Sequence, residues 1–171
     1  YEELRYWLHR LLSPASAGPR ALRYPRGGQS ARLARFGCTG QPYDCLRKEV
    51  GAKAALVSYA DEVEDTLEAA DQLAQQGIPC DVYKLVQIWP LPQELVADLE
   101  SYSLILMAEE CVVRGGIGEH LEAAMRQAGW QGKYLHRGVT QPQLPHATVP
   151  QIKQVLGLDG QSLAKDIQQA L

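Results

Sequence analysis

Two short segments of this sequence carry side chains that could bind an anion or act as acids and bases. The first is Arg23-Tyr24-Pro25-Arg26-Gly27, where two guanidinium groups lie three residues apart ahead of a Pro-Gly turn. A planar guanidinium can donate two hydrogen bonds to one phosphate or carboxylate. Arg23 and Arg26 could therefore converge on a single anion. The same spacing also fits a domain edge where both arginines pair with acidic surface groups.

The second segment follows an apolar run and reads Glu109-Glu110-Cys111-Val112-Val113-Arg114-Gly115-Gly116-Ile117-Gly118. Carboxylates just past a buried strand lie where open α/β sheets usually bind ligands. The glycines let the backbone approach closely and begin a helix whose free N–H groups favour anions. The spacing fits neither the dinucleotide fingerprint nor the Walker loop. A tight turn with Glu110 paired to Arg114 is the alternative.

The remaining reactive side chains form no recognisable constellation in the sequence. His136 and His146 flank an irregular stretch, and the sequence contains no nucleophile elbow or Ser-His-Asp order. The four cysteines match no zinc spacing and are expected to be free thiols. They are Cys38, Cys45, Cys80 and Cys111. We expect no metal site in this chain.

Composition places the chain among ordinary globular proteins. Its 171 residues are 46% hydrophobic and 22% charged, with a net charge of −3, which fits one domain or one domain plus part of another. No apolar run approaches the ~20 residues of a membrane helix, and no signal peptide is evident. We expect a cytoplasmic protein without a membrane partner.

Charge is unevenly distributed along the sequence. Between Arg20 and Lys53, eight basic residues face two acidic ones. Such an excess can mark an anionic partner. The stretch has no basic helix and few interleaved aromatic residues, so a phosphorylated small molecule fits better than nucleic acid. A solvated arginine-rich loop is the alternative.

Apolar periodicity predicts alternating strands and helices. Residues 2–12 are predicted as a helix, 21–24 as a short strand and 28–51 as an irregular linker with a possible strand at 32–36. Further strands are predicted at 54–59, 82–88, 104–108 and 133–136. Helices are predicted after Asp61, through Leu95 and Leu99, after Gly118, after a Thr148–Gln151 capping box, and along a Leu163, Ile167 and Leu171 stripe. This order predicts an α/β fold, a three-layer sandwich with a mostly parallel, mixed sheet.

Taken in series, these segments resemble the C-terminal end of the 1-deoxy-D-xylulose-5-phosphate synthases, members of the transketolase family. The resemblance rests on Ala21 to Gly27, Leu56 to Tyr59, Trp89-Pro90-Leu91, Glu109 to Gly118, Arg137-Gly138 and Leu156 to Asp159. It implies three parts. Residues 1–27 would be the tail of a pyrimidine-binding domain, 28–52 a linker, and 53–171 a transketolase-like C-terminal domain.

The resemblance implies a parent enzyme that condenses pyruvate with glyceraldehyde 3-phosphate to 1-deoxy-D-xylulose 5-phosphate, for isoprenoid and thiamine biosynthesis. Thiamine diphosphate and Mg2+ would supply the chemistry, and the parent would be a homodimer. The family's cofactor motifs lie outside this chain, so we expect it alone to bind no cofactor and to be inactive. The alternatives are a noncatalytic α/β subunit or interaction module of a transketolase-like enzyme with another acceptor, and a small-molecule binder at Gly115 to Gly118.

The resemblance also implies site residues, none of them catalytic in this chain. Arg26 or Arg23 would hold the substrate phosphate. Glu109, Glu110, Gly115, Gly116, Gly118 and His146 are family-motif positions. The sequence departs from the family at Val86, where a second phosphate-binding arginine is expected, at Pro92 and at Ala147. Either Lys84, on the same strand face as Val86, replaces that arginine, or the acceptor is another molecule.

Overall fold

The computed structural model describes residues 1–14, 18–25, 27–141 and 143–171. In chain order the described elements are α1 (Glu2–Leu12), the 3-10 helix η1 (Leu33–Phe36), β1 (Tyr43–Arg47), β2 (Ala54–Ser58), α2 (Glu62–Gln75), β3 (Cys80–Leu85), α3 (Gln93–Leu99), β4 (Leu104–Val112), α4 (Ile117–Gln127), β5 (Lys133–Val139), α5 (Val149–Leu156) and α6 (Gly160–Ala170). The alternation of strands and helices from β2 onward agrees with the sequence prediction.

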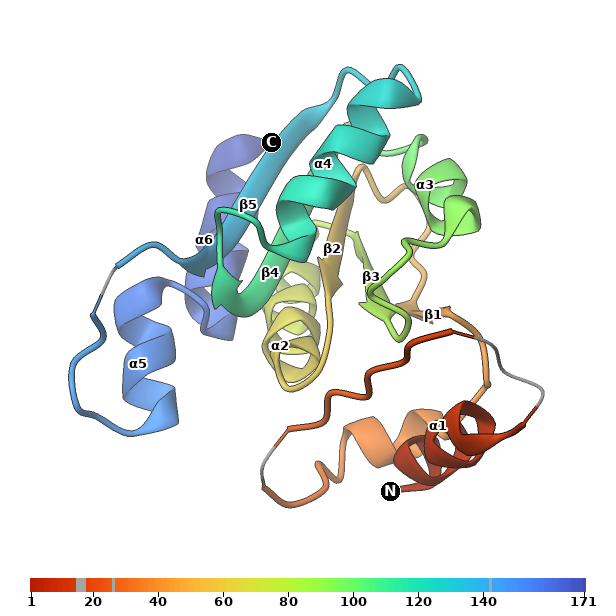
Figure 1. Ribbon diagram of the computed structural model, residues 1–171. Helices are drawn as coiled ribbons and strands as arrows, with labels where there is room; N and C mark the ends of the chain where they lie inside the picture. The colour runs from red at the N-terminus through yellow and green to blue at the C-terminus, as the bar shows by residue number, and fades with distance from the viewer. Residues whose placement is uncertain (15–17, 26, 142) are drawn as a thin grey trace.

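The five strands form one sheet in the order β1-β3-β2-β4-β5. Strands β3, β2, β4 and β5 are parallel to their neighbours, whereas β1 is antiparallel to β3. Helices α2 and α6 pack on one face of the sheet, and α3 and α4 pack on the other (Figure 1). The predicted three-layer α/β sandwich with a mostly parallel, mixed sheet is confirmed.

The central strands are apolar because both of their faces are covered. All five residues of β2 are buried. Ala54 and Leu56 join the core under α2 and α6, whereas Ala55 and Val57 join the core under α3 and α4. A strand with a core on each side gains from apolar residues at every position, so its sequence shows an unbroken apolar run.

The region before β2 departs most from the sequence predictions. Residues 21–24 form no strand, because no other strand in the described part of the chain lies beside them to complete the hydrogen bonds. The possible strand at 32–36 is instead the 3-10 helix η1. Conversely, Tyr43–Arg47, inside the predicted linker, forms the edge strand β1.

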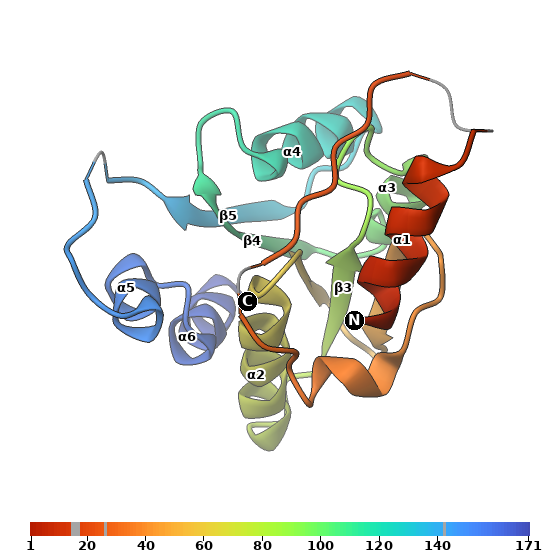
Figure 2. The ribbon, with the colours of Figure 1, turned by 60° about the horizontal axis from the view of Figure 1, so that its bottom comes forward.

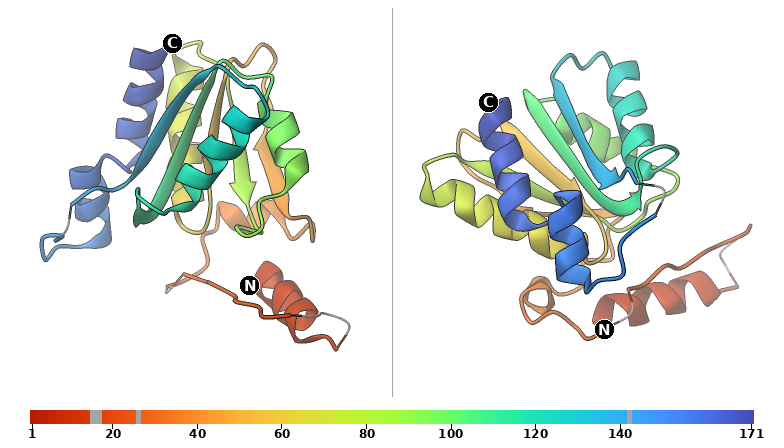
Figure 3. Two further views of the ribbon diagram at one scale, coloured as in Figure 1. Left: turned by 45° about the horizontal axis from the view of Figure 1, so that its top comes forward. Right: turned by 90° about the vertical axis from the view of Figure 1, so that its left-hand side faces the viewer.

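Helix α1 and residues 18–25 lie at the end of the sheet where β2 and β4 terminate (Figure 2, Figure 3). Ion pairs join this region and the segment that follows it to the rest of the fold. Lys84 Nζ of β3 lies 2.5 Å from Glu3 Oε1 of α1. Asp71 of α2 accepts hydrogen bonds from Arg32 and Arg47, each at 2.7 Å. The predicted linker is therefore tied to α2 by ion pairs.

Helix boundaries agree with the sequence in part. Asp61 is the N-cap residue of α2, but its side chain makes no capping hydrogen bond. The predicted capping box of Thr148 and Gln151 is present at α5. In α6, Leu163 is fully buried, whereas Leu171 is 57% exposed and lies beyond the end of the helix. The predicted stripe therefore ends before Leu171.

Candidate functional site at the carboxyl edge of the sheet

The sheet has a topological switch point between β2 and β4. After β2 the chain moves to β3 on one side, and after β4 it moves to β5 on the other. Diverging loops leave a crevice at the carboxyl ends of two such strands, where α/β proteins usually bind ligands. The side chains at this edge come from Tyr59 to Glu62, after β2, and from Glu109 and Glu110. The sequence had suggested that both glutamates lie just past the end of the strand. That prediction is wrong, because β4 continues through them to Val112.

Glu109 is the centre of a buried hydrogen-bond network. Its side chain is 0% exposed. The carboxylate accepts a hydrogen bond from the Tyr59 hydroxyl at 2.7 Å, and its other oxygen lies 2.6 Å from His136 Nε2. It also accepts hydrogen bonds from the backbone N–H groups of Ile117 at 3.1 Å and Gly118 at 3.0 Å. The N-terminus of α4, which the sequence offered as an anion site, is therefore filled by the chain's own carboxylate.

These partners set the ionisation of the network. Burial alone would raise the pKa of Glu109, but the hydrogen bonds from His136, Gly118 and Tyr59 outweigh it and lower the pKa below 4.5. Burial and the hydrogen bond to Glu109 raise the pKa of Tyr59 well above its ordinary value. Glu109 is thus an anion and Tyr59 a neutral donor at neutral pH.

The glycines at this corner make room for the network. A Cβ on Gly116 would collide with Glu109 Oε1, and a Cβ on Gly118 would collide with His136 Nε2. Gly115 has a φ of 76°, which favours glycine in this turn. The glycines let the N-terminus of α4 approach the Glu109 side chain closely, so this corner stabilises the fold.

The sequence analysis did not identify Tyr59 as a site residue and gave His136 no partner. A signal for Tyr59 is its position directly after the apolar run of β2, whereas His136 lies in the middle of β5.

A second cluster lies on the α2 face of the same edge. Lys153 Nζ of α5 lies 2.6 Å from Asp65, 3.1 Å from Glu62 and 3.4 Å from Glu110. Glu110 therefore pairs with Lys153 and not with Arg114. Glu62 is 0% exposed; its ion pair with Lys153 lacks hydrogen-bond geometry, so neither of its oxygens has a hydrogen-bond partner among the described residues. Burial raises the pKa of Glu62 to about 8.

The residues predicted to bind the substrate phosphate do not all lie near the Glu109 network. Arg23 is exposed, and its guanidinium carbon lies 5.5 Å from the ring centroid of Tyr59. Arg26 lies outside the described residues. Lys84 is 17% exposed and paired with Glu3, near the partly buried Val86. The structure thus brings Arg23, but not Lys84, to the Glu109 network.

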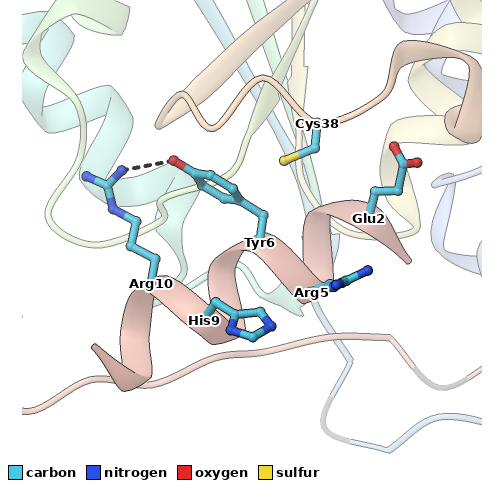
Figure 4. A pocket seen from close by; sticks show the side chains of 6 residues that line it. All are labelled: Glu2, Arg5, Tyr6, His9, Arg10 and Cys38. Carbon is cyan, nitrogen blue, oxygen red and sulfur yellow. Dashed lines mark hydrogen bonds between the residues drawn. The ribbon is translucent and has the colours of Figure 1, made fainter. Parts of the chain in front are cut away.

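The other predicted positions lie apart from this network. His146 is exposed in the loop before α5. An open groove lies between α1 and Cys38, lined also by Glu2, Arg5, Tyr6, His9 and Arg10 (Figure 4). Arg10 donates to the Tyr6 hydroxyl at 3.1 Å. None of the predicted site residues that the structure describes lines this groove.

The described residues form neither a metal-binding cluster nor a membrane-spanning helix. No group of three or more His, Cys, Asp or Glu side chains there is placed to hold a metal ion. Within the same residues, no helix has the length and apolar character needed to span a bilayer.

The fold and the site define a doubly wound α/β domain whose switch point holds a buried glutamate network. Residues 44–163 match the family described as the transketolase C-terminal domain. Because this match spans more than half of the chain, the chain belongs to that family. The match begins inside the segment that the sequence analysis interpreted as a linker.

Curated relatives agree with this membership. The chain is 34% identical over 151 residues to a 1-deoxy-D-xylulose-5-phosphate synthase of Rhodococcus jostii, covering 88% of the chain and 23% of that protein. It is 30% identical over 178 residues to the synthase of Magnetococcus marinus, covering 99% of the chain and 27% of that protein. The chain thus spans about a quarter of the length of these relatives.

Solved structures show the same fold. A split-gene transketolase, described as an "inactive beta4 tetramer", superposes with a TM-score of 0.69 at 22% sequence identity. The superposition covers 77% of this chain and 43% of that one. A transketolase of Campylobacter jejuni gives a TM-score of 0.56 at 16% identity, over 75% of this chain and 18% of that one.

Proposed function

We propose that this chain is the C-terminal portion of a thiamine-diphosphate enzyme that condenses pyruvate with glyceraldehyde 3-phosphate. The observation that carries the proposal is the similarity to the Rhodococcus synthase over 88% of the chain. The parent would be a cytoplasmic homodimer using small-molecule substrates. Thiamine diphosphate, held with Mg2+ by parts outside this chain, would supply the carbanion chemistry.

In this proposal the chain contributes binding and placement. Arg23 would donate to the substrate phosphate from the carboxyl edge of the sheet. The Glu109 network would hold α4 and β5 in register beneath it. The chain alone would bind no thiamine diphosphate. In support of this, Glu109 already accepts hydrogen bonds from the N–H groups of Ile117 and Gly118, so the N-terminus of α4 is not free to bind an anion.

A second candidate is a transketolase-like enzyme with an unphosphorylated acceptor. The observation in its favour is the ion pair of Lys84 with Glu3 at 2.5 Å. Because that carboxylate already neutralises Lys84, the lysine gains less from a substrate phosphate. Val86, beside it, offers no donor.

The test uses the full polypeptide that contains this chain. With pyruvate and glyceraldehyde 3-phosphate it should form 1-deoxy-D-xylulose 5-phosphate, and Arg23→Ala should raise the KM for the phosphorylated acceptor about 10- to 100-fold, from the loss of about 1.5–3 kcal/mol for a charge-assisted bond. Equal activity with unphosphorylated glyceraldehyde, unaffected by Arg23→Ala, would favour the second candidate.

The isolated chain offers an independent measurement. Calorimetric titration with thiamine diphosphate and Mg2+ should show no binding. Micromolar binding by the 171-residue chain would overturn the proposal that the cofactor site lies elsewhere in the parent.

A further inference from the structure

Arg23 and Tyr59 meet at the carboxyl edge although they come from different parts of the sequence. The guanidinium carbon lies 5.5 Å from the ring centroid, within the ~6 Å at which a cation is attracted to an aromatic face. No carboxylate among the described residues forms an ion pair with Arg23, whose side chain is exposed. Its N–H groups thus remain available to an external anion.

The ring beneath Arg23 is fixed in place. Tyr59 is 5% exposed, and its hydroxyl donates to Glu109 at 2.7 Å. Glu109 is itself held by two N–H groups of α4 and by His136. The next residue, Ala60, has a φ of 54°, a conformation that a non-glycine residue adopts only where its surroundings require it. Tyr59 therefore gives Arg23 a rigid surface in an otherwise irregular segment.

We propose that Tyr59 is a positioning residue that holds Arg23 in the orientation needed to bind a phosphate group. The inference rests on the proposed function, in which Arg23 contacts the substrate phosphate. A guanidinium over an aromatic ring keeps its in-plane N–H donors free for an anion. Without the ring, Arg23 loses that restraint and has to be ordered by the ligand itself, which weakens binding.

Nuclear magnetic resonance on the 171-residue chain, with inorganic phosphate as the probe, tests both steps. In the wild type, the Tyr59 ring protons should give cross-relaxation to the Arg23 side chain, and the Arg23 Nε–H signal should shift saturably with phosphate. Tyr59→Leu should abolish the ring-current shift of Arg23 and weaken its phosphate response about two- to five-fold, the effect expected for one exposed cation–π contact.

Two further variants separate positioning from a general structural effect. Tyr59→Phe keeps the ring but loses the hydrogen bond to Glu109, so it should retain most of the Arg23 shift and phosphate response. Tyr24, the aromatic residue next to Arg23 in the sequence, is 64% exposed. Tyr24→Leu should leave both readouts unchanged. If Tyr59→Leu fails to fold, the wild-type cross-relaxation and the Tyr59→Phe titration still decide the matter.

The outcomes are distinguishable. Missing Tyr59–Arg23 cross-relaxation, or a phosphate response unchanged in Tyr59→Leu, overturns the positioning role. Cross-relaxation without any phosphate response of wild-type Arg23 overturns the phosphate role of Arg23 in the proposed function, and with it this inference. Loss of the Arg23 ring-current shift together with a roughly two- to five-fold weaker phosphate response in Tyr59→Leu, but not in Tyr59→Phe or Tyr24→Leu, supports both roles.

Discussion

Replacing Glu109 by glutamine should destabilise the chain strongly. The wild-type carboxylate is 0% exposed and takes four hydrogen bonds, from Tyr59, His136, Ile117 and Gly118. Glutamine keeps one oxygen and replaces the other by an NH2 group, which cannot accept. Each oxygen of Glu109 accepts two of these hydrogen bonds. In the glutamine variant, the two groups that donated to the lost oxygen would face the NH2 group, which is itself a donor.

The magnitude follows from the bonds that are lost. Two charge-assisted hydrogen bonds at about 1.5–3 kcal/mol each give a loss of about 3–6 kcal/mol. For a chain of this size, that lowers Tm by roughly 10–20 °C. Urea unfolding followed by tryptophan fluorescence should show a lower midpoint with an unchanged slope.

Acidification provides a second measurement on the same variant. Because the folded pKa of Glu109 is held below its ordinary value of 4.5, the ionised carboxylate stabilises the fold above that pH. This contribution disappears as the pH falls through the lower, folded value. Glutamine cannot titrate. The stability difference between wild type and Glu109→Gln should therefore shrink as the pH falls below 4.5.

Glu122→Gln, on the outer surface of α4, is the matched control. The Glu122 side chain is 42% exposed, and its loss should change stability by less than about 0.5 kcal/mol. A Glu109→Gln variant within about 1 kcal/mol of the wild type would refute the network as a source of stability. So would a difference that stays constant on acidification.

Three further changes test neighbouring parts of this edge. Ala60→Gly should stabilise the fold by about 0.5–1 kcal/mol, because φ is 54° there; Ala128→Gly, at φ −71°, should destabilise it in the same urea assay. Lys153→Met should cost about 2–4 kcal/mol, since it leaves Asp65 and Glu110 uncompensated; Lys165→Met should cost less than about 0.5 kcal/mol, and equal losses would contradict the assigned pairs. Burial raises the pKa of Glu62 from 4.5 to about 8, so the wild type loses stability as the pH rises from about 4.5 to about 8, where the unfolded chain ionises Glu62 but the folded chain keeps it protonated. Glu62→Gln should therefore gain stability relative to the wild type between about pH 5 and about pH 9, and a pH-independent difference in urea unfolding would refute this.

The interior elements were predictable because their local pattern and their burial agree. The apolar run at 104–108 indicates a strand covered on both faces, and Leu104 to Ala108 are buried as expected. The Thr148–Gln151 capping box likewise depends only on residues close in sequence. In such segments the local signal and the tertiary environment favour the same structure.

The edge strand β1 could not be predicted in this way. Tyr43–Arg47 is only five residues long and has no fully buried position, so it shows no apolar run. It becomes a strand because β3 offers an unpaired edge, as in the pairing of Tyr43 with Leu85. The reverse holds for residues 21–24, where the strand-like sequence finds no partner strand in the described part of the chain.

The sequence by itself determined the α/β architecture and the place of the candidate site, since strand and helix periodicity depend on neighbouring residues. It also supplied the carboxylates and glycines at 109–118. Only the tertiary structure decided that Glu109 fills the N-terminus of α4, that Glu110 pairs with Lys153, and that Arg23 lies over Tyr59. These partners lie on different elements, and hydrogen bonds, ion pairs and ring contacts act over a few ångströms of space regardless of separation along the chain.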